Sequence, residues 1–462
     1  MTRSNSNAPM PKVVQRTITP RTSPMNLRPA LTIAALAIAL VTTGCSGNFQ
    51  QAVSGPVQAA GFSGSVHGGQ QPVSASSVQL YAVPTTGYGA TATLLATTTT
   101  DANGNFTLPS YSCAGVNQVY LTATGGNPGL TAGTNNTALV LMAPLGSCVV
   151  AQTNAATTVV NMNEVTTVAG AWALSRFIVS PTVAGVSSTN TTGLGNAFVA
   201  ANKVANIATG AASGPALPAG ATLPVSEINT LANILASCVN TTGSTTAGTP
   251  CATLFAAATP PGGSAPTDTF TAALNIARNA ANNVSTLFAL SVANAPFQPS
   301  LAVAPTNFLI GIHYVGGGLN HPNAMAVDAS GNVWLTNGSA NTVSEFSSVG
   351  TALSPVGGYS NANLSLPSGI AIDTNGNAWV SNSTGNSVTK ITSLGGSFTT
   401  YNGGGLNAPS SVSIDGSGNV WLTNKGNNSV SEFASTGVAI SSTNGYTGAG
   451  LNQPVGIAVD AQ

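Results

Sequence analysis

The sequence predicts a multidomain, mainly β protein: a β-sandwich, then an α-helical region, then an incomplete β-propeller of three full blades. Three observations support this fold class. Apolar residues alternate with a two-residue period in the first part, follow a helical period in the second, and belong to a repeated motif in the third. The 462 residues are sufficient for two to four domains, so each segment is interpreted separately.

The composition is poor in charge. Only 4% of the residues are charged, against roughly 25% in ordinary soluble proteins. After Cys45 the chain keeps five basic and ten acidic residues, a net charge of about −5. Nucleic acid binding needs clustered Lys and Arg, so the dispersed basic residues exclude nucleic acid as a partner. These residues are Arg176, Lys203, Arg278, Lys390 and Lys425.

Residues 1–44 have the pattern of a signal peptide with a leader before it. Arg28 precedes an apolar run from Ala30 to Val41, and small residues follow up to Cys45. The run is shorter than the roughly 20 residues that a membrane-spanning helix needs. Because residues 1–24 are polar, translation starts at either Met1 or Met25.

Thr42-Thr43-Gly44-Cys45 resembles the lipobox of bacterial lipoproteins. The resemblance implies that Cys45 is diacylated and becomes the mature N-terminus, which places the protein in the bacterial cell envelope, at the outer membrane or the cell surface. Residues 45–57 would then be a linker after the lipid anchor. The alternative is ordinary signal-peptidase cleavage that leaves Cys45 as a spare thiol.

The other four cysteines are an even number, as expected for disulfides in an oxidising compartment. Cys113 and Cys148 flank the end of the first domain, and Cys238 and Cys251 enclose a Ser/Thr/Gly-rich stretch. We expect these two pairs, and closure of the second loop would stabilise the fold by about 3 kcal/mol. A metal site would need closer thiol spacing, such as CxxC, which is absent.

Residues 58–150 alternate like half-buried strands, most clearly at Ser65–His67, Val78–Tyr81, Phe106–Leu108 and Val119–Thr122. Gly68-Gly69 before Pro72-Val73, the strand Val78–Tyr81 and the turn Asp101–Phe106 resemble the carboxypeptidase regulatory-like family. The resemblance implies a small transthyretin-like β-sandwich that serves as a spacer, without peptidase activity.

Residues 151–295 follow a helical period. Val165, Val168 and Trp172 lie on one face of a predicted helix, so Trp172 is interpreted as a core residue rather than a ligand platform. Ile228 to Cys238 repeats the pattern. A longer helix is expected to begin with Thr267 as N-cap and to run past Phe288.

Residues 303–462 contain one motif in four copies that begin at Pro322, Pro367, Pro409 and Pro454, at spacings of 45, 42 and 45 residues. This period, with four short strand patterns in each copy, is typical of a propeller blade. The fourth copy stops at Asp460, so we expect the natural chain to continue for one or more blades. The alternative is a thin fourth blade made from residues 307–314 and 455–460.

Each full copy has an Asp-x-x-Gly-Asn-x-Trp core. The Asp is expected to accept backbone N–H bonds, the Gly to take a positive φ, and the Trp to lie between neighbouring blades. These structural residues are Asp328, Gly331, Trp334, Asp373, Gly376, Trp379, Asp415, Gly418 and Trp421. A calcium loop through Asp373, Asn375 and Asn377 is the weaker alternative, since the other copies offer only serine at the middle position.

The motifs resemble NHL-repeat propellers and the related streptogramin-lyase-like repeats. The lyase and lactonase relatives in this class imply acidic and histidine side chains around a divalent metal at the channel mouth, and only His313 and His321 are candidates for that role here. Glu345 and Glu432 occupy the place of Lys390 in the second copy, which favours a solvated strand face. Glu164, Glu227 and Asp268 are expected at helix starts.

No catalytic, cofactor or metal site is predicted from these residues. The leading hypothesis is therefore an exported envelope lipoprotein, a non-catalytic binding or scaffold module. It would be held to the membrane by its lipid and would display a propeller to a protein or glycan partner. The alternative is a propeller lyase or lactonase with a divalent metal at the channel mouth.

Overall fold

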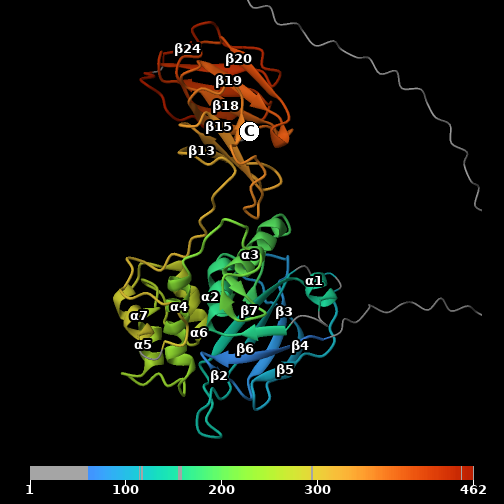
Figure 1. The fold of residues 1–462 in the computed structure, drawn as a ribbon, viewed down its shortest axis with the longest axis vertical. Helices are drawn as coiled ribbons and strands as arrows, with labels where there is room; N and C mark the ends of the chain where they lie inside the picture. The colour runs from blue at the N-terminus through green and yellow to red at the C-terminus, as the bar shows by residue number, and fades with distance from the viewer. Residues whose placement is uncertain are drawn as a thin grey trace, which may run out of the picture. The chain divides into compact units, whose positions relative to one another are not determined.

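The computed structural model describes residues 61–113, 115, 118–154, 159–292, 295–448 and 450–460. The signal peptide, Cys45 and the linker 45–57 lie outside these residues, so their predictions stay predictions. Figure 1 shows the described elements from the first strand to the last.

The first part is built on two sheets, one antiparallel and one mixed, as expected for strands with a two-residue alternation. Strands β1, β3, β5 and β6 match the four segments singled out from the sequence. The first sheet has the order β4 (Thr93–Thr99), β3 (Ser77–Ala82), β6 (Gln118–Thr124), β7 (Val140–Ser147). The second contains β2 (Gln71–Pro72), β1 (Ser63–Gly68) and β5 (Asn105–Thr107), with β8 (Val159–Met162) parallel to β1.

One core fills the space between these sheets. Val66 of β1, Leu80 of β3 and Leu121 of β6 are each 0% exposed and belong to the same apolar cluster. The opposite face of the β4-β3-β6-β7 sheet is apolar as well, because Tyr120 and Met142 point into a second cluster with the helices. A sheet with two apolar faces needs cover on both sides, and the helices supply the second cover.

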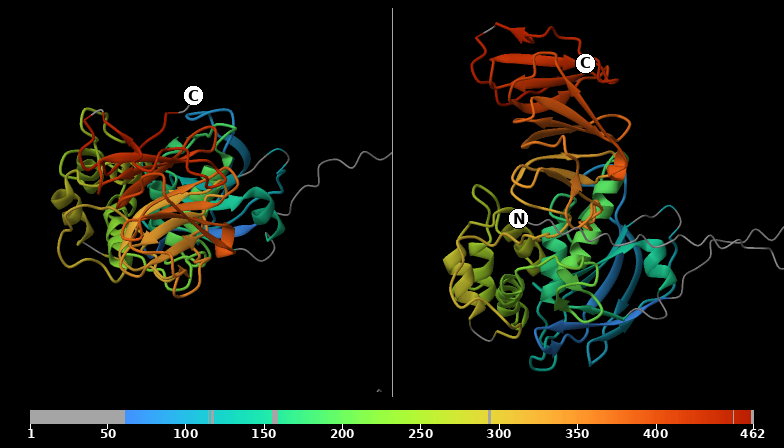
Figure 2. Two further views of the ribbon diagram at one scale, coloured as in Figure 1. Left: turned by 90° about the horizontal axis from the view of Figure 1, so that it is seen from above. Right: turned by 45° about the horizontal axis from the view of Figure 1, so that its top comes forward.

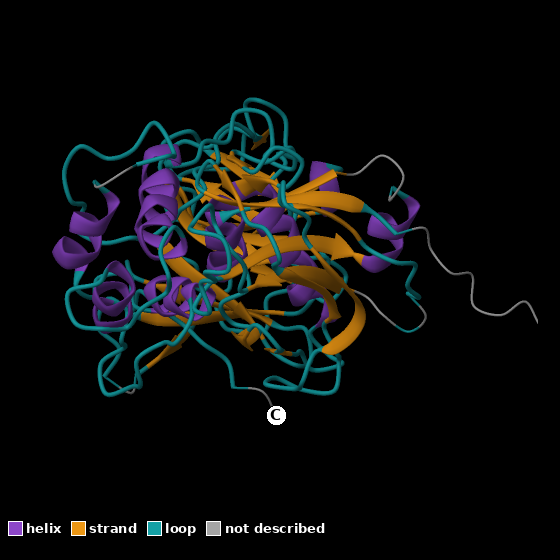
Figure 3. Ribbon diagram, turned by 90° about the horizontal axis from the view of Figure 1, so that it is seen from below, coloured by secondary structure: helices purple, strands orange, loops and turns teal. Residues whose placement is uncertain are grey.

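The second part consists mainly of helices, as the helical period predicts. The helices are α1 (Cys148–Thr153), α2 (Glu164–Ala173), α3 (Thr191–Val204), α4 (Val225–Val239), α5 (Pro250–Ala257), α6 (Thr269–Arg278) and α7 (Val284–Ser291). Short strand pairs β9 (Ile178–Ser180) with β10 (Val183–Ala184), and β11 (Ala205–Asn206) with β12 (Ala211–Ala212), connect them. Figure 3 shows helices gathered beside the strands.

The predicted boundary at residue 150 does not separate two cores. Strand β8 comes after it yet pairs with β1 of the first domain. Helix α2 then packs Val165 and Val168 against the sheet, and Trp172 is partly buried beside them, which supports its interpretation as a core residue. The sequence pattern shows the local period of each segment. It does not show against which sheet or helix that segment packs.

The predicted long helix is two helices. Its N-cap is Asp268 and not Thr267, because the Asp268 carboxylate accepts the Thr271 N–H at 2.8 Å. The helix ends at Arg278, and α7 starts only after Asn283, whose φ of 47° is left-handed. Glu164 and Glu227 lie in the first turns of α2 and α4, as expected for anions at helix starts.

Both expected disulfides are present. Cys113 is bonded to Cys148, with Cα atoms 5.7 Å apart, and Cys238 to Cys251, with Cα atoms 4.5 Å apart. They are consistent with an extracytoplasmic protein, because disulfides persist in oxidising compartments. Among the residues that the structure covers, no helix is long and apolar enough to cross a membrane.

The third part contains three successive four-stranded antiparallel sheets, one for each full motif copy (Figure 2). The first is β13 (Pro322–Val327), β14 (Val333–Asn337), β15 (Thr342–Phe346), β16 (Tyr359–Ser360). The second is β17 (Pro367–Ile372), β18 (Ala378–Asn382), β19 (Ser387–Ile391), β20 (Phe398–Asn402), with the 3₁₀ turn Ser393–Gly395. The third is β21 (Pro409–Ile414), β22 (Val420–Asn424), β23 (Ser429–Phe433), β24 (Tyr446–Thr447).

Neither segment proposed for a thin fourth blade forms one. Within residues 307–314, Phe308 and Ile310 are buried in the core that the helices share, so this segment belongs to the second part and not to the repeats. Residues 455–460 have no strand pairing in the described structure. The third sheet contacts the fourth copy through Ser410, whose hydroxyl donates to the Pro454 carbonyl at 3.0 Å.

Candidate binding surface

The strand register divides the repeat sheets into two ends. Pro367, Asn382 and Ser387 are paired in one row of the second sheet, and the turns beside this row form what we call the asparagine end. Ile372, Ala378 and Ile391 form the row at the other extremity, which we call the aspartate end because the Asp turns lie there. The first and third sheets have the same register.

At the aspartate end each motif Asp closes its own hairpin, as the sequence predicts. In the second copy Asp373 Oδ1 accepts the Asn375 and Asn377 backbone N–H groups at 3.0 and 2.9 Å, and Gly376 has a φ of 79°. The corresponding bonds recur at Asp328 and Asp415. Turn chemistry therefore accounts for this part of the motif.

A further bond links the turn to the motif tryptophan, which the sequence reading missed. The indole Nε1 of Trp334, Trp379 and Trp421 donates to Oδ2 of the motif Asp at 3.4, 3.1 and 2.9 Å. The constant offset of six residues between Asp and Trp was the available signal. The indole–Asp hydrogen bond fixes the orientation of the ring against which the neighbouring sheet packs.

The tryptophans do lie between sheets. Trp334 is 0% exposed and shares a core with Ile370 and Val380 of the next sheet, and Trp379 does the same with Val412 and Leu422. Trp421 is partly exposed. The predicted packing role is confirmed for the first two copies.

These hydrogen bonds lower the pKa of Asp373 and Asp415. The bond from Trp421 is the main cause of the lowered pKa of Asp415. Burial acts to raise the pKa of Asp373, but bonds from Asn377 and Trp379 and the Lys390 charge bring it below its ordinary value. The amide nitrogen of Asn377 faces Asp373 at 2.9 Å, so its donor side occupies the position that a calcium loop would need for an oxygen.

The prediction of a solvated strand face for Glu345, Glu432 and Lys390 is wrong for the two acids. Glu345 is 1% exposed and Glu432 is 8% exposed. Each accepts a tyrosine hydroxyl from the fourth strand of its own sheet: Tyr359 at 2.8 Å and Tyr446 at 2.7 Å. Burial raises the pKa of Glu345, and the Tyr359 hydrogen bond partly opposes this.

Lys390, at the same position of the second sheet, makes different contacts from the two acids. Its ammonium lies 3.6 Å from Asp373 Oδ2 and 5.1 Å from the centre of the Trp379 ring. The sign reversal between copies thus reflects two sets of partners, a Glu–Tyr hydrogen bond or a Lys–Asp ion pair. The tyrosine that recurs at the fourth strand was the sequence signal for this arrangement.

The asparagine end is braced by amide side chains that the sequence reading did not single out. The motif's last residue, Asn337, Asn382 or Asn424, is 0% exposed in every copy. Asn382 Nδ2 donates to the hydroxyls of Ser387 and Thr389 at 3.0 and 2.9 Å, while its Oδ1 accepts the Ser365 N–H. Both amide N–H groups and the carbonyl oxygen of this buried side chain thus have a partner inside the fold.

A second asparagine links each sheet to the segment that leads into the next motif copy. Asn341, Asn386 and Asn428 are left-handed, with φ of 56°, 47° and 55°, as Asn tolerates in tight turns. Their Oδ1 atoms accept backbone N–H groups of Leu366, Ala408 and Gln453 at 2.7, 2.7 and 2.8 Å. The turns of successive sheets are therefore held at a fixed spacing.

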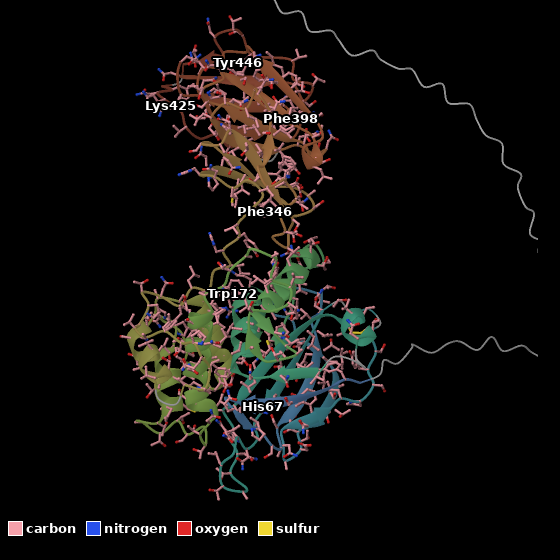
Figure 4. All side chains as sticks on the ribbon, viewed as in Figure 1. His67, Trp172, Phe346, Phe398, Lys425 and Tyr446 are labelled. Atoms are coloured by element: carbon pink, nitrogen blue, oxygen red, sulfur yellow. A yellow bond between two sulfur atoms is a disulfide. The ribbon has the colours of Figure 1, made fainter. Side chains whose placement is uncertain are left out.

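The exposed side chains of the asparagine end are mostly hydroxyls and amides. Ser339, Thr384 and Lys425 occupy its turns and are exposed, and Lys425 alone among these three carries a charge. Figure 4 shows Lys425 and Phe398, a residue of the aspartate-end row, at opposite ends of the repeat sheets. The surface is thus polar, with one turn from each sheet and a single charge, that of Lys425, among these three residues.

The two histidines proposed for a channel-mouth metal are not brought together into a site. His321 is exposed, and its ring contacts Asn320 Oδ1 at 2.7 Å. The His313 backbone is bridged to Thr222 in the second part. Over the described residues, no group of three or more His, Cys, Asp or Glu side chains has the geometry to hold a metal ion.

Comparison with known proteins gives similarity at the level of structure. No family model matches the chain, and no curated protein matches it. A streptogramin B lyase structure is 24% identical, with a TM-score of 0.25, over 28% of this chain and 43% of that chain. A catalytically inactive virginiamycin B lyase from Staphylococcus aureus with quinupristin is 22% identical, with a TM-score of 0.25 and the same coverage.

A nidogen/laminin complex structure is 19% identical, with a TM-score of 0.24, over 28% of this chain and 49% of that chain. This chain thus spans less than half the length of these structures. The three successive four-stranded antiparallel sheets of this chain are consistent with a propeller module, as the sequence repeat predicts.

Proposed function

We propose that this protein is an exported, lipid-anchored envelope protein that acts as a non-catalytic binding or scaffold module. Its repeat sheets present the asparagine end to a protein or glycan partner. The lipid on Cys45 holds the module at the membrane, and along the chain the sandwich and its helices come between that cysteine and the repeats.

The observation that carries this proposal is that the carboxylates of the three repeat sheets accept hydrogen bonds from groups of the fold itself. Asp328, Asp373 and Asp415 each accept bonds from their own turn, and Glu345 and Glu432 each accept a tyrosine hydroxyl from their own sheet. A general acid or base needs a free position to exchange a proton with substrate. The hydrogen bonds of these five side chains stabilise turns and strands, which favours a structural role over proton transfer.

The repeated geometry of the asparagine end favours binding through several weak contacts. Each sheet contributes one turn of similar shape, and the Asn341, Asn386 and Asn428 bonds set the spacing. Linked contacts of this kind bind more tightly together than singly, because the second contact forms within an existing complex. The absence of strong charge at Ser339 and Thr384 fits a neutral polar partner better than a charged one.

The test compares two double variants of the full chain as baits for solubilised envelope material. Ser339→Arg with Thr384→Arg places bulk and charge on the asparagine end. Ser330→Arg with Thr374→Arg makes the matched change on the aspartate end, where both positions are also exposed. We expect the first pair to lose at least 90% of the captured partner and the second pair to keep it, at equal thermal stability. Equal capture by the two variants would contradict this assignment.

A further inference from the structure

A separate pocket lies in the first two parts of the chain, remote in sequence from the repeats. Its volume is about 510 Å³, within the range of small-molecule sites. Five segments meet around it: the β1–β2 turn at Gly69, the β8–α2 junction at Asn163, the β11–β12 turn, the start of α4, and residues 296–298. His67, labelled in Figure 4, is one of its lining residues.

The frame of the pocket is fixed by hydrogen bonds between these segments. Asn163 caps α2 by accepting the Thr166 N–H, and its Nδ2 donates to the Gly210 carbonyl at 2.8 Å. Asn229 Nδ2 donates to the Pro299 carbonyl at 2.9 Å. Asn233 exchanges two bonds with the Phe297 backbone, at 2.9 and 3.0 Å. A preformed wall of this kind lowers the ordering cost of binding.

Several lining groups keep free hydrogen-bonding capacity. The His67 ring is half-buried and makes no hydrogen bond to another described residue. Asn229 uses its Nδ2, so its Oδ1 stays available as an acceptor toward the pocket it lines. Gln70 likewise donates through Nε2 to the Pro296 carbonyl and keeps its Oε1. Phe297 supplies an apolar surface on the same wall.

The pocket is electrically neutral. Its lining contains no Lys, Arg, Asp or Glu. Burial lowers the pKa of His67, so the ring is uncharged near neutral pH. Glu164 lies behind the wall, fully buried, with both carboxylate oxygens 3.0 Å from the Gly69 nitrogen. A phosphate or carboxylate ligand would find no cation here, and an ammonium ligand no anion on the surface.

We propose that this pocket binds a short neutral saccharide. Amide and imidazole groups offer both donors and acceptors, which match the hydroxyls of a sugar, and Phe297 offers contact for its C–H face. A peptide bound by strand addition would need an exposed strand edge along the wall. The edge strands that line the pocket, β12 and β8, each offer it only two residues, Ala211 with Ala212 and Asn161 with Met162. The Asn161 N–H is already donated to the Ile207 carbonyl at 2.7 Å.

The experiment uses the full chain and saturation-transfer NMR with defined probes. The saccharides are glucose, mannose, N-acetylglucosamine, cellobiose and N,N′-diacetylchitobiose, and the peptide probe is N-acetyl-Ala-Asn-Ala-amide. Ala211→Trp fills the pocket from an exposed lining position, and His67→Ala removes a ring that holds no other part of the fold. Ala132→Trp, an exposed position in the β6–β7 loop that does not line the pocket, is the control.

We expect at least one saccharide to bind, with at least tenfold weaker affinity in Ala211→Trp and His67→Ala and no change in Ala132→Trp. Circular dichroism establishes that all variants are folded. No saccharide signal for any probe, a signal from the peptide alone, or saccharide binding that survives Ala211→Trp would each overturn the proposal.

Discussion

Glu164 is a carboxylic acid enclosed by the fold without a cationic partner. It is 0% exposed and starts α2, and its contact across the fold is the Gly69 N–H of the β1–β2 turn. Burial raises its pKa to about 8, although the Gly69 hydrogen bond favours the charged form. The group is therefore protonated in the folded protein at neutral pH and ionised in the unfolded chain.

This difference predicts that stability falls as pH rises. Between the ordinary value of 4.5 and about 8, the native state holds a proton that the unfolded state has released. The contribution of this proton to the free energy of unfolding is fully present below pH 4.5. It is lost toward pH 8, by up to about 1.4 kcal/mol per pH unit. Glu164→Gln removes this titration. Urea denaturation should therefore show that the stability of the variant, relative to that of the native protein, increases from pH 5 to pH 7.5.

Asp101→Asn is the contrasting control for that experiment. Hydrogen bonds from the Asn105 and Asn103 backbone lower the pKa of Asp101 in an exposed hairpin turn. Its contribution is present above the ordinary value and is lost as pH falls, opposite in sign to that of Glu164. A Glu164→Gln protein with the same pH profile as the native chain would show that burial does not shift this group.

At the scale of the element, the motif tryptophans differ in what covers them. Trp379 lies between the second and third sheets and is 0% exposed, while Trp421 is partly exposed on the third. Both donate their indole N–H to an aspartate at about 3 Å. Substitution therefore removes the same bond at both positions and a different amount of packing.

Trp379→Ala is expected to destabilise the repeat sheets by about 3–5 kcal/mol, the range for large cavities in a core. Trp421→Ala is expected to cost less than half of this. Urea denaturation followed by circular dichroism measures both. Equal losses would mean that packing between sheets contributes little and that the Asp–Trp bond accounts for the effect.

The elements themselves were largely predictable from the sequence. Turn residues such as Gly376 and Asp373 act within a few positions, so their pattern reports the hairpin directly. The break between α6 and α7 was missed because Asn279 to Asn283 interrupts no apolar period strongly enough to show in the pattern. The capping residue was misplaced by one position, since Thr267 and Asp268 are both good caps and only geometry selects between them.

At the scale of the whole molecule, membrane attachment is expected to depend on one atom, the Cys45 sulfur. Cys45→Ser should release the protein from the membrane fraction, because the diacylated thiol is the expected anchor. Mass analysis of the mature N-terminus of the native chain should show the lipid. Ser46→Ala, which keeps Cys45, should remain membrane-bound, and equal retention of the Cys45→Ser protein would refute lipid anchoring.

The sequence by itself determined the features that depend on neighbours along the chain. It predicted the strand segments of the sandwich, the amphipathic helices, the repeat with its Asp and Gly turns, and the two cysteine pairs. Hydrophobic period and turn chemistry act over a few residues, so the pattern indicates most of these elements, apart from the break between α6 and α7.

Only the tertiary structure decided what covers each of these elements. It buried Glu345 and Glu432 beside Tyr359 and Tyr446, joined β8 to the sandwich across the expected boundary, and assembled the pocket at His67 from five separated segments. Burial and hydrogen-bond partners depend on which segments meet in space. The tyrosine of the fourth strand recurs in the sequence, but only the folded sheets show that Tyr359 and Tyr446 lie against Glu345 and Glu432.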